Sequence, residues 1–226
     1  MEEGLAKKRG PKPKGKVKIV WTANFAYAIG LLVTDGNLSP NGRHITFVSK
    51  DTEQITNLQK ALRIKVTPSY TRSGYTGKLT PRIQFSDSLF WAFLVSIGVM
   101  PNKSKIIGPV AIPDKYFMDF VRGIFDGDGS FHSYIDTRWR GSHMFYTIFA
   151  SASNEHILWL QQKLQDRIGI SGHITRGEGV SVYQLKYAKR ESFKILKNMY
   201  YTSSVLCLSR KRKKIESGLK VESARK

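Results

Sequence analysis

Two aspartates at the ends of two similar apolar segments are the residues best suited to chemistry in this chain. Asp35 is followed by Gly36, and Asp128 is followed by Gly129. Two carboxylates that lie close together repel each other unless a divalent cation neutralises them. Mg²⁺ prefers carboxylate, water and phosphate oxygens, and such an ion activates water for attack on a phosphodiester. We therefore predict that Asp35 and Asp128 form a metal-binding catalytic pair.

An internal repeat places the two aspartates at equivalent positions. Segment 29–36 resembles segment 122–129 at an offset of 93 residues, and further along the chain the offset becomes 102, so that Leu58 falls on Leu160. Repeats of this kind indicate a duplicated structural unit. A longer hairpin in the second unit, between residues 129 and 151, accounts for the change of offset.

Each unit reads as α-β-β-α-β-β-α from its hydrophobic periodicity and turn residues. In the first unit we predict helix 25–34 with Asn24 as N-cap, strands 37–39 and 44–50, a helix through Ile55 and Leu62, strands 65–72 and 78–86, and helix 87–97. In the second unit we predict helix 115–126, strands 130–138 and 143–151, helix 154–167, strands 172–177 and 181–188, and helix 189–200. Glycines after the first helix of each unit, Gly36 and Gly129, are expected to form left-handed caps.

Small residues spaced four apart predict where the two units meet. Gly30 and Thr34 have this spacing in the first segment, as do Gly123 and Gly127 in the second. Such residues let two helix backbones approach closely. We therefore expect the helices to cross at Gly30 and Gly123, which brings Asp35 near Asp128.

Composition favours a nucleic-acid partner. The chain has 37 Lys and Arg against 17 Asp and Glu, a net charge of +20, and residues 19–208 alone hold 22 basic and 13 acidic side chains. A body of this charge attracts a polyanion. The longest apolar run is too short to span a membrane. The lone Cys207 allows no internal disulfide, so we expect an intracellular protein of cytoplasm, nucleoid or organelle that is not secreted.

The two segments resemble the motif of the LAGLIDADG homing endonucleases. Ala28–Gly36 reads AIGLLVTDG, and Val121–Gly129 reads VRGIFDGDG. Two copies in one chain are similar to the single-chain, pseudo-dimeric members, and the resemblance implies an α+β fold with two pseudo-symmetric α-β-β-α-β-β-α halves. The motif helices would pack at the centre, and the sheets would form a saddle-shaped DNA-binding surface. The expected organisation is a basic tail at 1–18, an N-terminal half at 19–99, a linker at 100–114, a C-terminal half at 115–208 and a basic tail at 209–226.

The resemblance also implies an activity. A monomer would cut a long specific double-stranded DNA site at one phosphodiester per strand with Mg²⁺, Mn²⁺ could substitute, and Ca²⁺ would not support cutting. Thr34 and Gly127 would join Asp35 and Asp128 at the metals. A basic residue near the scissile phosphate is expected at Lys50, which falls on Ala152 in the second half. Asp126 falls on Val33, so we interpret it as a structural residue.

Side chains on the strands are expected to contact DNA. Arg suits guanine, Gln suits adenine, and Asp can accept from cytosine. The candidates are Tyr70, Arg72, Tyr75, Lys78, Arg82, Gln84, His132, Tyr134, Asp136, Arg138, Arg140, His143, Arg176, Gln184 and Lys186. The alternative function is an RNA maturase or a non-cleaving DNA-binding regulator on the same scaffold.

Overall fold

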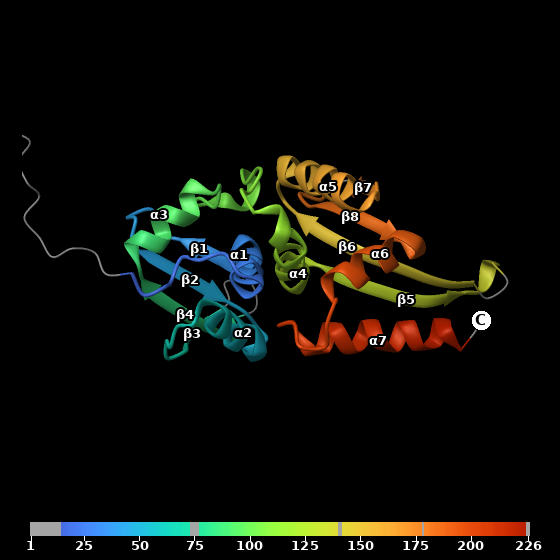
Figure 1. Ribbon diagram of the computed structural model, residues 1–226, viewed down its shortest axis with the longest axis horizontal. Coiled ribbons are helices and arrows are strands. Elements are labelled where there is room, and N and C mark those ends of the chain that lie inside the picture. The colour runs from blue at the N-terminus through green and yellow to red at the C-terminus, as the bar shows by residue number, and fades with distance from the viewer. Residues whose placement is uncertain (1–14, 73–76, 140–141, 178, 225–226) are drawn as a thin grey trace, which may run out of the picture.

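Two copies of one element pattern follow each other along the chain (Figure 1). The structure is a computed structural model, and it describes residues 15–72, 77–139, 142–177 and 179–224. The first copy comprises α1 (Ala23–Asp35), β1 (Gly36–Leu38), β2 (His44–Val48), α2 (Thr52–Leu62), β3 (Ser69–Arg72), β4 (Leu79–Ser86) and α3 (Ser88–Ser96). The second comprises α4 (Phe117–Asp128), β5 (Ser130–Asp136), β6 (Ser142–Ser151), α5 (Asn154–Ile168), β7 (His173–Arg176), β8 (Tyr183–Ala188) and α6 (Lys189–Met199). Short 3-10 turns are η1 (Lys103–Lys105), η2 (Asp114–Tyr116) and η3 (Thr137–Trp139), and α7 (Ser209–Ser223) follows the second copy.

Each half contains one four-stranded antiparallel sheet. The strand order is β1-β2-β4-β3 in the first half and β5-β6-β8-β7 in the second, which are the same topology. In both sheets the inner strands alternate between buried and partly exposed residues, as a sheet with one covered face requires. Phe47, for example, is buried opposite Ile83. The predicted α+β fold with two equivalent halves is therefore confirmed.

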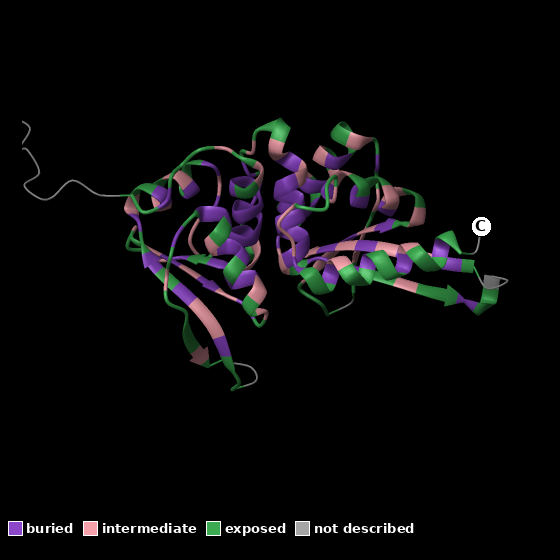
Figure 2. Cartoon of the chain, turned by 60° about the horizontal axis from the view of Figure 1, so that its bottom comes forward, coloured by how far each residue is buried: buried purple, intermediate pink, exposed green. Residues whose placement is uncertain are grey.

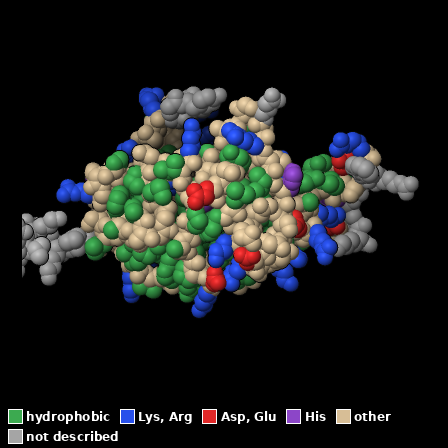
Figure 3. Space-filling model, turned by 90° about the horizontal axis from the view of Figure 1, so that it is seen from above, with side chains coloured by type: hydrophobic (Ala, Val, Ile, Leu, Met, Phe, Trp, Pro, Cys, Tyr) green, Lys and Arg blue, Asp and Glu red, His purple; other side chains and the backbone are tan. Residues whose placement is uncertain are grey.

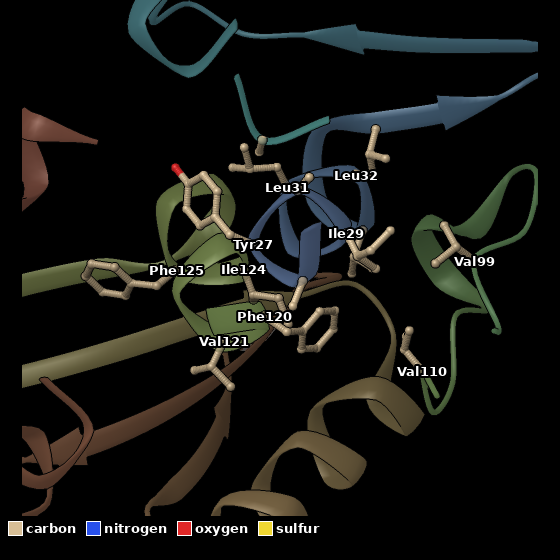
Figure 4. Close-up of a cluster of buried hydrophobic side chains, with 14 of the residues drawn as sticks. Tyr27, Ile29, Leu31, Leu32, Val99, Val110, Phe120, Val121, Ile124 and Phe125 are labelled. Carbon is tan, nitrogen blue, oxygen red and sulfur yellow. The ribbon is translucent and has the colours of Figure 1, made fainter. Parts of the chain in front are cut away.

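Helices α1 and α4 lie side by side at the centre of the molecule (Figures 1 and 2). A Cβ added at Gly30 would collide with the carbonyl oxygen of Phe120 and lie 2.8 Å from the Cα of Gly123. Apolar side chains of the two helices fill the space around this crossing (Figure 4). Only glycine permits so close a backbone approach, so the predicted crossing of the motif helices is confirmed.

The ends of the motif helices differ from the prediction. Thr22, and not Asn24, caps the N-terminus of α1, because its hydroxyl accepts from the backbone N–H of Phe25 at 3.1 Å. Gly36 and Gly129 have φ of −84° and −81°, so neither forms the left-handed cap that was expected. Both are needed for space, since a Cβ at Gly36 would lie 2.5 Å from the carbonyl oxygen of Leu32. The chain can thus pass directly from each helix into a strand.

The basic segment at 209–226 is not a simple tail in its described part. Helix α7 covers Ser209–Ser223 and runs along β5 (Figure 1). A Cβ added at Gly218 would lie 3.0 Å from the Phe131 ring, and Ile215 is buried. From sequence, residues 210–214 can be either a phosphate-contacting helix end or part of a solvated tail, because the many charges of this segment obscure a sparse apolar stripe. The structure has a helix here.

Candidate active site and sheet surface

Asp35 and Asp128 are the last residues of the two crossing helices. The preceding residues, Thr34 and Gly127, approach so closely that a Cβ at Gly127 would lie 2.5 Å from the Cβ of Thr34. Burial, followed by the negative charge of Asp128, raises the pKa of Asp35 to about 6. Burial also raises the pKa of Asp128. The structure thus brings the predicted pair together as two interacting carboxylates.

Two buried lysines, one from the segment that follows each half, lie beside this pair. The ammonium group of Lys103 donates to the carbonyl oxygen of Gly36. The ammonium group of Lys211 donates to the carbonyl oxygens of Phe125 at 2.5 Å and Gly129 at 2.6 Å. Each lysine therefore neutralises the carbonyl end of one motif helix. Burial lowers the pKa of each lysine to about 8, while the negative charges of Asp35 and Asp128 act in the opposite direction.

Sequence reasoning missed both lysines. It assigned one to the linker and the other to the basic tail, although each follows the third helix of its half. A signal existed, because Lys103 and Lys211 are related by an offset of 108 residues, close to the 102 of the main repeat. Runs of neighbouring lysines and arginines on both sides made either position indistinguishable from a solvated charge.

Two cavities adjoin the carboxylates and are related by the internal repeat. A cavity of about 590 Å³ is lined by Asp35 and also reaches Asp128, and another of about 350 Å³ is lined by Asp128 without Asp35. At equivalent places the first is lined by Ser49, Lys50, Gln54 and Thr80, and the second by Ser151, Ala152, His156 and Val182. The cavities are thus equivalent in position and different in chemistry.

In the first cavity, polar side chains form hydrogen bonds that hold the Asp35 carboxylate in place. Gln54 donates from its side-chain amide to Asp35 at 3.4 Å and accepts from the Ser49 hydroxyl at 2.5 Å. In the second cavity His156 has its Nδ1 2.9 Å from the carbonyl oxygen of Gly108. Lys50 is exposed at the wall of the first cavity.

The other residues assigned to the site have local partners. The Thr34 hydroxyl donates to the carbonyl oxygen of Leu31 at 2.9 Å. The carbonyl oxygen of Gly127 accepts from Lys211 at 3.2 Å. Asp126 is buried and accepts from the Tyr27 hydroxyl at 2.8 Å and from the backbone N–H of Leu208 at 2.7 Å. Asp126 thus ties the segment before α7 to the motif helices, which agrees with the structural role predicted for it.

The donor set fits a hard divalent cation. Asp35 and Asp128 supply oxygen ligands only, and each has a raised pKa that a bound cation would lower. In the part of the chain that the structure describes, no group of three or more His, Cys, Asp and Glu is arranged to hold a metal by itself. Water and phosphate oxygens would therefore have to complete the coordination.

Strand register decides which predicted DNA-contacting residues share a face, because directly opposed residues of an antiparallel pair point the same way. Arg82 and Gln84 of β4 lie on the face away from buried Ile83, and Gln184 and Lys186 of β8 lie on the corresponding face. His132 and Tyr134 of β5 are also exposed on that face of their sheet, as they pair with Tyr146 and Met144.

Three of the predicted DNA-contacting residues lie on the opposite face of their sheet. Tyr70 is opposed to Pro81, Arg72 to Leu79 and Arg176 to Tyr183, so they alternate with the face just described. Arg72 nevertheless lines the cavity beside Asp35 from the end of its strand. Residues on the shared face that the prediction missed are Asn37, His44, Thr46, Ser69, Thr71, Tyr146, His173 and Thr175.

Two predicted contact residues are buried. His143 lies beneath α7, 2.7 Å from the Ser133 hydroxyl and 3.4 Å from a carboxylate oxygen of Glu222. Asp136 accepts from the guanidinium of Arg138 at 2.8 Å. The prediction that His143 and Asp136 contact DNA is therefore wrong. The sequence did not reveal that α7 covers His143 or that Asp136 pairs with Arg138 at the end of the hairpin. Arg138 and Lys78 are exposed, whereas Tyr75 and Arg140 lie outside the described residues.

On one face of the molecule, charged and hydrophobic side chains occupy different regions. Seen from above, Lys and Arg lie mainly toward the edges, and hydrophobic side chains are spread over the middle (Figure 3). Among the described residues no helix has the length and apolar character to cross a membrane.

Comparisons with known proteins agree at the level of fold. No family model matches the sequence, and a comparison with curated proteins gives no match. Full-length DUF199/WhiA from Thermotoga maritima superimposes with a TM-score of 0.57 and 17% identity, over 91% of this chain and 62% of that chain. The I-LtrWI LAGLIDADG homing endonuclease bound to target DNA superimposes with a TM-score of 0.56 and 8% identity, over 85% and 87%. I-DmoI in complex with DNA and Mn gives a TM-score of 0.52 and 15% identity, over 81% and 98%.

These likenesses define a class of structure. The chain has the two-half LAGLIDADG fold, and it is similar both to homing endonucleases and to the LAGLIDADG domain of DUF199/WhiA. It spans less than two thirds of full-length WhiA. At these identities the likeness concerns the fold alone.

Proposed function

We propose that this protein is a site-specific endonuclease for double-stranded DNA that hydrolyses one phosphodiester in each strand. The proposal rests on one observation. Asp35 and Asp128 meet at the ends of two crossing helices, with Lys103 and Lys211 buried beside them. Structural helix ends rarely gather two carboxylates and two buried ammonium groups, because each group loses hydration there.

Each group of residues would have its own role in the reaction. Asp35 and Asp128 would hold Mg²⁺, or Mn²⁺ in its place, and the bound ion would supply an activated water and neutralise charge at the phosphate. Lys103 and Lys211 contribute positive charge where a phosphate becomes more negative during attack. Gln54 orients Asp35 through its amide. The sheet residues that share one face position the duplex through backbone and base contacts.

The alternative is a protein that binds DNA or RNA on this scaffold without cutting. The specific observation in its favour is that DUF199/WhiA, as well as the homing endonucleases, is among the structural neighbours. Retention of both aspartates favours the endonuclease.

Cleavage of a randomised duplex library tests the proposal. The full chain is incubated with the library in Mg²⁺, Ca²⁺ or chelator, and cut products are sequenced. We expect cutting at one family of sites in Mg²⁺ or Mn²⁺ and binding without cutting in Ca²⁺. Enrichment of bound sequences with no cutting in any metal would instead support the non-cleaving alternative.

Asparagine variants then assign the chemistry. Asp35→Asn and Asp128→Asn should each abolish double-strand cleavage and preserve binding of the selected site. Asp166→Asn is the matched control, since Asp166 is exposed on α5 and its hydrogen bond among the described residues is accepted from Gln162. Wild-type cutting of both strands by Asp35→Asn or Asp128→Asn would contradict the assignment.

A further inference from the structure

A further cavity begins at Gly129, the residue that follows Asp128, and is lined by positive charge. It has a volume of about 300 Å³, and its walls are formed by Gly129, Ser130, Phe131, Arg210, Lys211 and Lys214. Three of these six residues are cationic and none is acidic. A cavity with such walls fits an anion of the size of a phosphate group.

The three cations differ in how many partners they have within the protein. The ammonium group of Lys211 donates to carbonyl oxygens at the end of α4. Arg210 binds Asp51 through its Nε at 3.0 Å and one terminal nitrogen at 2.7 Å. Lys214 is exposed and makes no hydrogen bond or ion pair within residues 15–72, 77–139, 142–177 and 179–224. Lys214 is therefore the cation that remains available to a ligand.

The position of Lys214 connects α7 to the sheet face that is proposed to hold DNA. After burial, the charges of Lys214 and Lys186 are the next causes that lower the pKa of His132. Lys186 and His132 belong to the face shared by β5, β6 and β8. The cavity thus opens where a duplex on this face would carry its backbone past Asp128.

Among the described residues, the first half has no cluster of cations at the equivalent place. Because Lys103 and Lys211 bind the equivalent carbonyl groups of Gly36 and Gly129, they fix the alignment of the flanking residues. Asn102 then corresponds to Arg210, and Ile106 corresponds to Lys214. Ile106 is 57% exposed and offers nothing to an anion.

We propose that Lys214, at the cavity that it forms with Arg210 and Lys211, binds a backbone phosphate of the DNA beside Asp128, and that among the described residues this site has no counterpart in the first half. This inference rests on the proposed function, because the phosphate is that of the DNA. The contacts to DNA would then differ between the two halves, because Ile106 occupies the position equivalent to Lys214.

A pair of neighbouring lysine variants tests the proposal. Lys214→Ala and Lys213→Ala each remove one exposed charge from α7, but only Lys214 lines the cavity. Binding of the full chain to a random-sequence duplex is measured over a range of salt concentrations. Each lost phosphate contact lowers the slope of log affinity against log salt by about 1. We expect this reduction, with binding weakened severalfold, in Lys214→Ala and a clearly smaller change in Lys213→Ala.

A second arm uses inorganic phosphate and does not depend on DNA. In the wild-type chain, titration with phosphate should shift the backbone amide resonances of Gly129 and Ser130, and Lys214→Ala should abolish these shifts. Equal salt slopes for the two variants would overturn the assignment to DNA, and if the phosphate shifts persisted the cavity would serve a free anion instead. If the wild-type chain bound no duplex at all, the proposed function would fail, and the phosphate titration would still decide whether the cavity binds anions.

Discussion

At the scale of single residues, burial and mutual repulsion govern the chemistry of the carboxylate pair. Asp35 has a pKa of about 6 because it is partly desolvated and lies near Asp128. Lys103 and Lys211 offset only part of this cost. The protein therefore holds an arrangement that is unfavourable by itself and that a bound cation would relieve.

The stability of the metal-free protein should report this cost. The folded protein binds a proton at Asp35 more tightly than the unfolded chain, so the contribution of this group to stability falls as pH rises from about 4 to about 6. Asp35→Asn removes the penalty, so the variant should be more stable than wild type at pH 7 by on the order of 1 kcal/mol after discounting for solvent screening. Urea unfolding in chelator at pH 4 and pH 7 measures the difference. A gap that is equal at both pH values would show that Asp35 carries no such strain.

Lys50 provides a second prediction at this scale. It lines the cavity beside Asp35, whereas Ala152 occupies the equivalent place beside Asp128. If Lys50 assists the reaction, Lys50→Met should slow cutting of one strand by about tenfold or more, and nicked DNA should accumulate. A single-turnover time course with each strand end-labelled measures both rates. Lys60→Met, at an exposed position of α2, is the control, and equal strand rates in wild type and Lys50→Met alike would make Lys50 a bystander.

At the scale of elements, the close crossing of α1 and α4 positions the site. Gly30 and Gly123 face each other with no room for a side chain, and the helix ends converge on the aspartates. Each helix then enters the first strand of its sheet directly. The same two helices therefore hold the two aspartates and the proposed DNA-binding faces.

A large side chain at this crossing should separate the helices. Gly30→Leu places atoms against the backbone carbonyl of Phe120, which cannot move aside as a flexible side chain would. Overpacking costs about 1–3 kcal/mol, and backbone collisions lie at the upper end. Thermal unfolding should show a lowered Tm or no folded state. Ala92→Leu, at an exposed position of α3, should leave the Tm unchanged, and an unchanged Tm in Gly30→Leu would contradict the crossing.

Helix α7 gives a second prediction at this scale. Ile215 is buried between α7 and the second half, so Ile215→Ala should destabilise the protein by about 2–4 kcal/mol. Lys213→Ala, two residues away and exposed, should change stability by less than about 0.5 kcal/mol. Chemical denaturation distinguishes a packed helix from a solvated tail, for which both substitutions would be neutral.

At the scale of the whole molecule, the two halves share one core. Apolar residues from both halves form a single buried cluster around the helix pair. The C-terminal segment adds links across the halves, because Asn57 donates to the carbonyl oxygen of Cys207 and Arg210 binds Asp51. The halves therefore depend on each other for burial and for the positions of the lysines.

Unfolding should accordingly be a single transition. Trp21 and Trp91 report on the first half and Trp159 on the second, so fluorescence of single-tryptophan variants follows each half separately. We expect their urea midpoints to coincide with each other and with the loss of helical circular dichroism. Two separated midpoints would show that the halves fold as independent domains.

The duplication, the order of the elements and the pairing of Asp35 with Asp128 could be predicted from the amino-acid sequence. These features depend on periodicity and spacing along the chain, which are local and survive in any correct fold. The glycines predicted the crossing for the same reason, since a backbone approach demands small residues at fixed intervals. Strand alternation also identified Arg82, Gln84, Gln184 and Lys186 as residues of one face.

Which charges belong to the site depends on how distant segments of the chain pack together. Lys103 and Lys211 enter it because the chain returns to the helix ends after each third helix, and no local pattern separates them from neighbouring lysines. The burial of His143 likewise follows from α7 lying over it, a contact between segments about 80 residues apart in sequence. Charge is a property of composition, but the proximity of a charge to a carboxylate depends on how the distant parts of the chain pack.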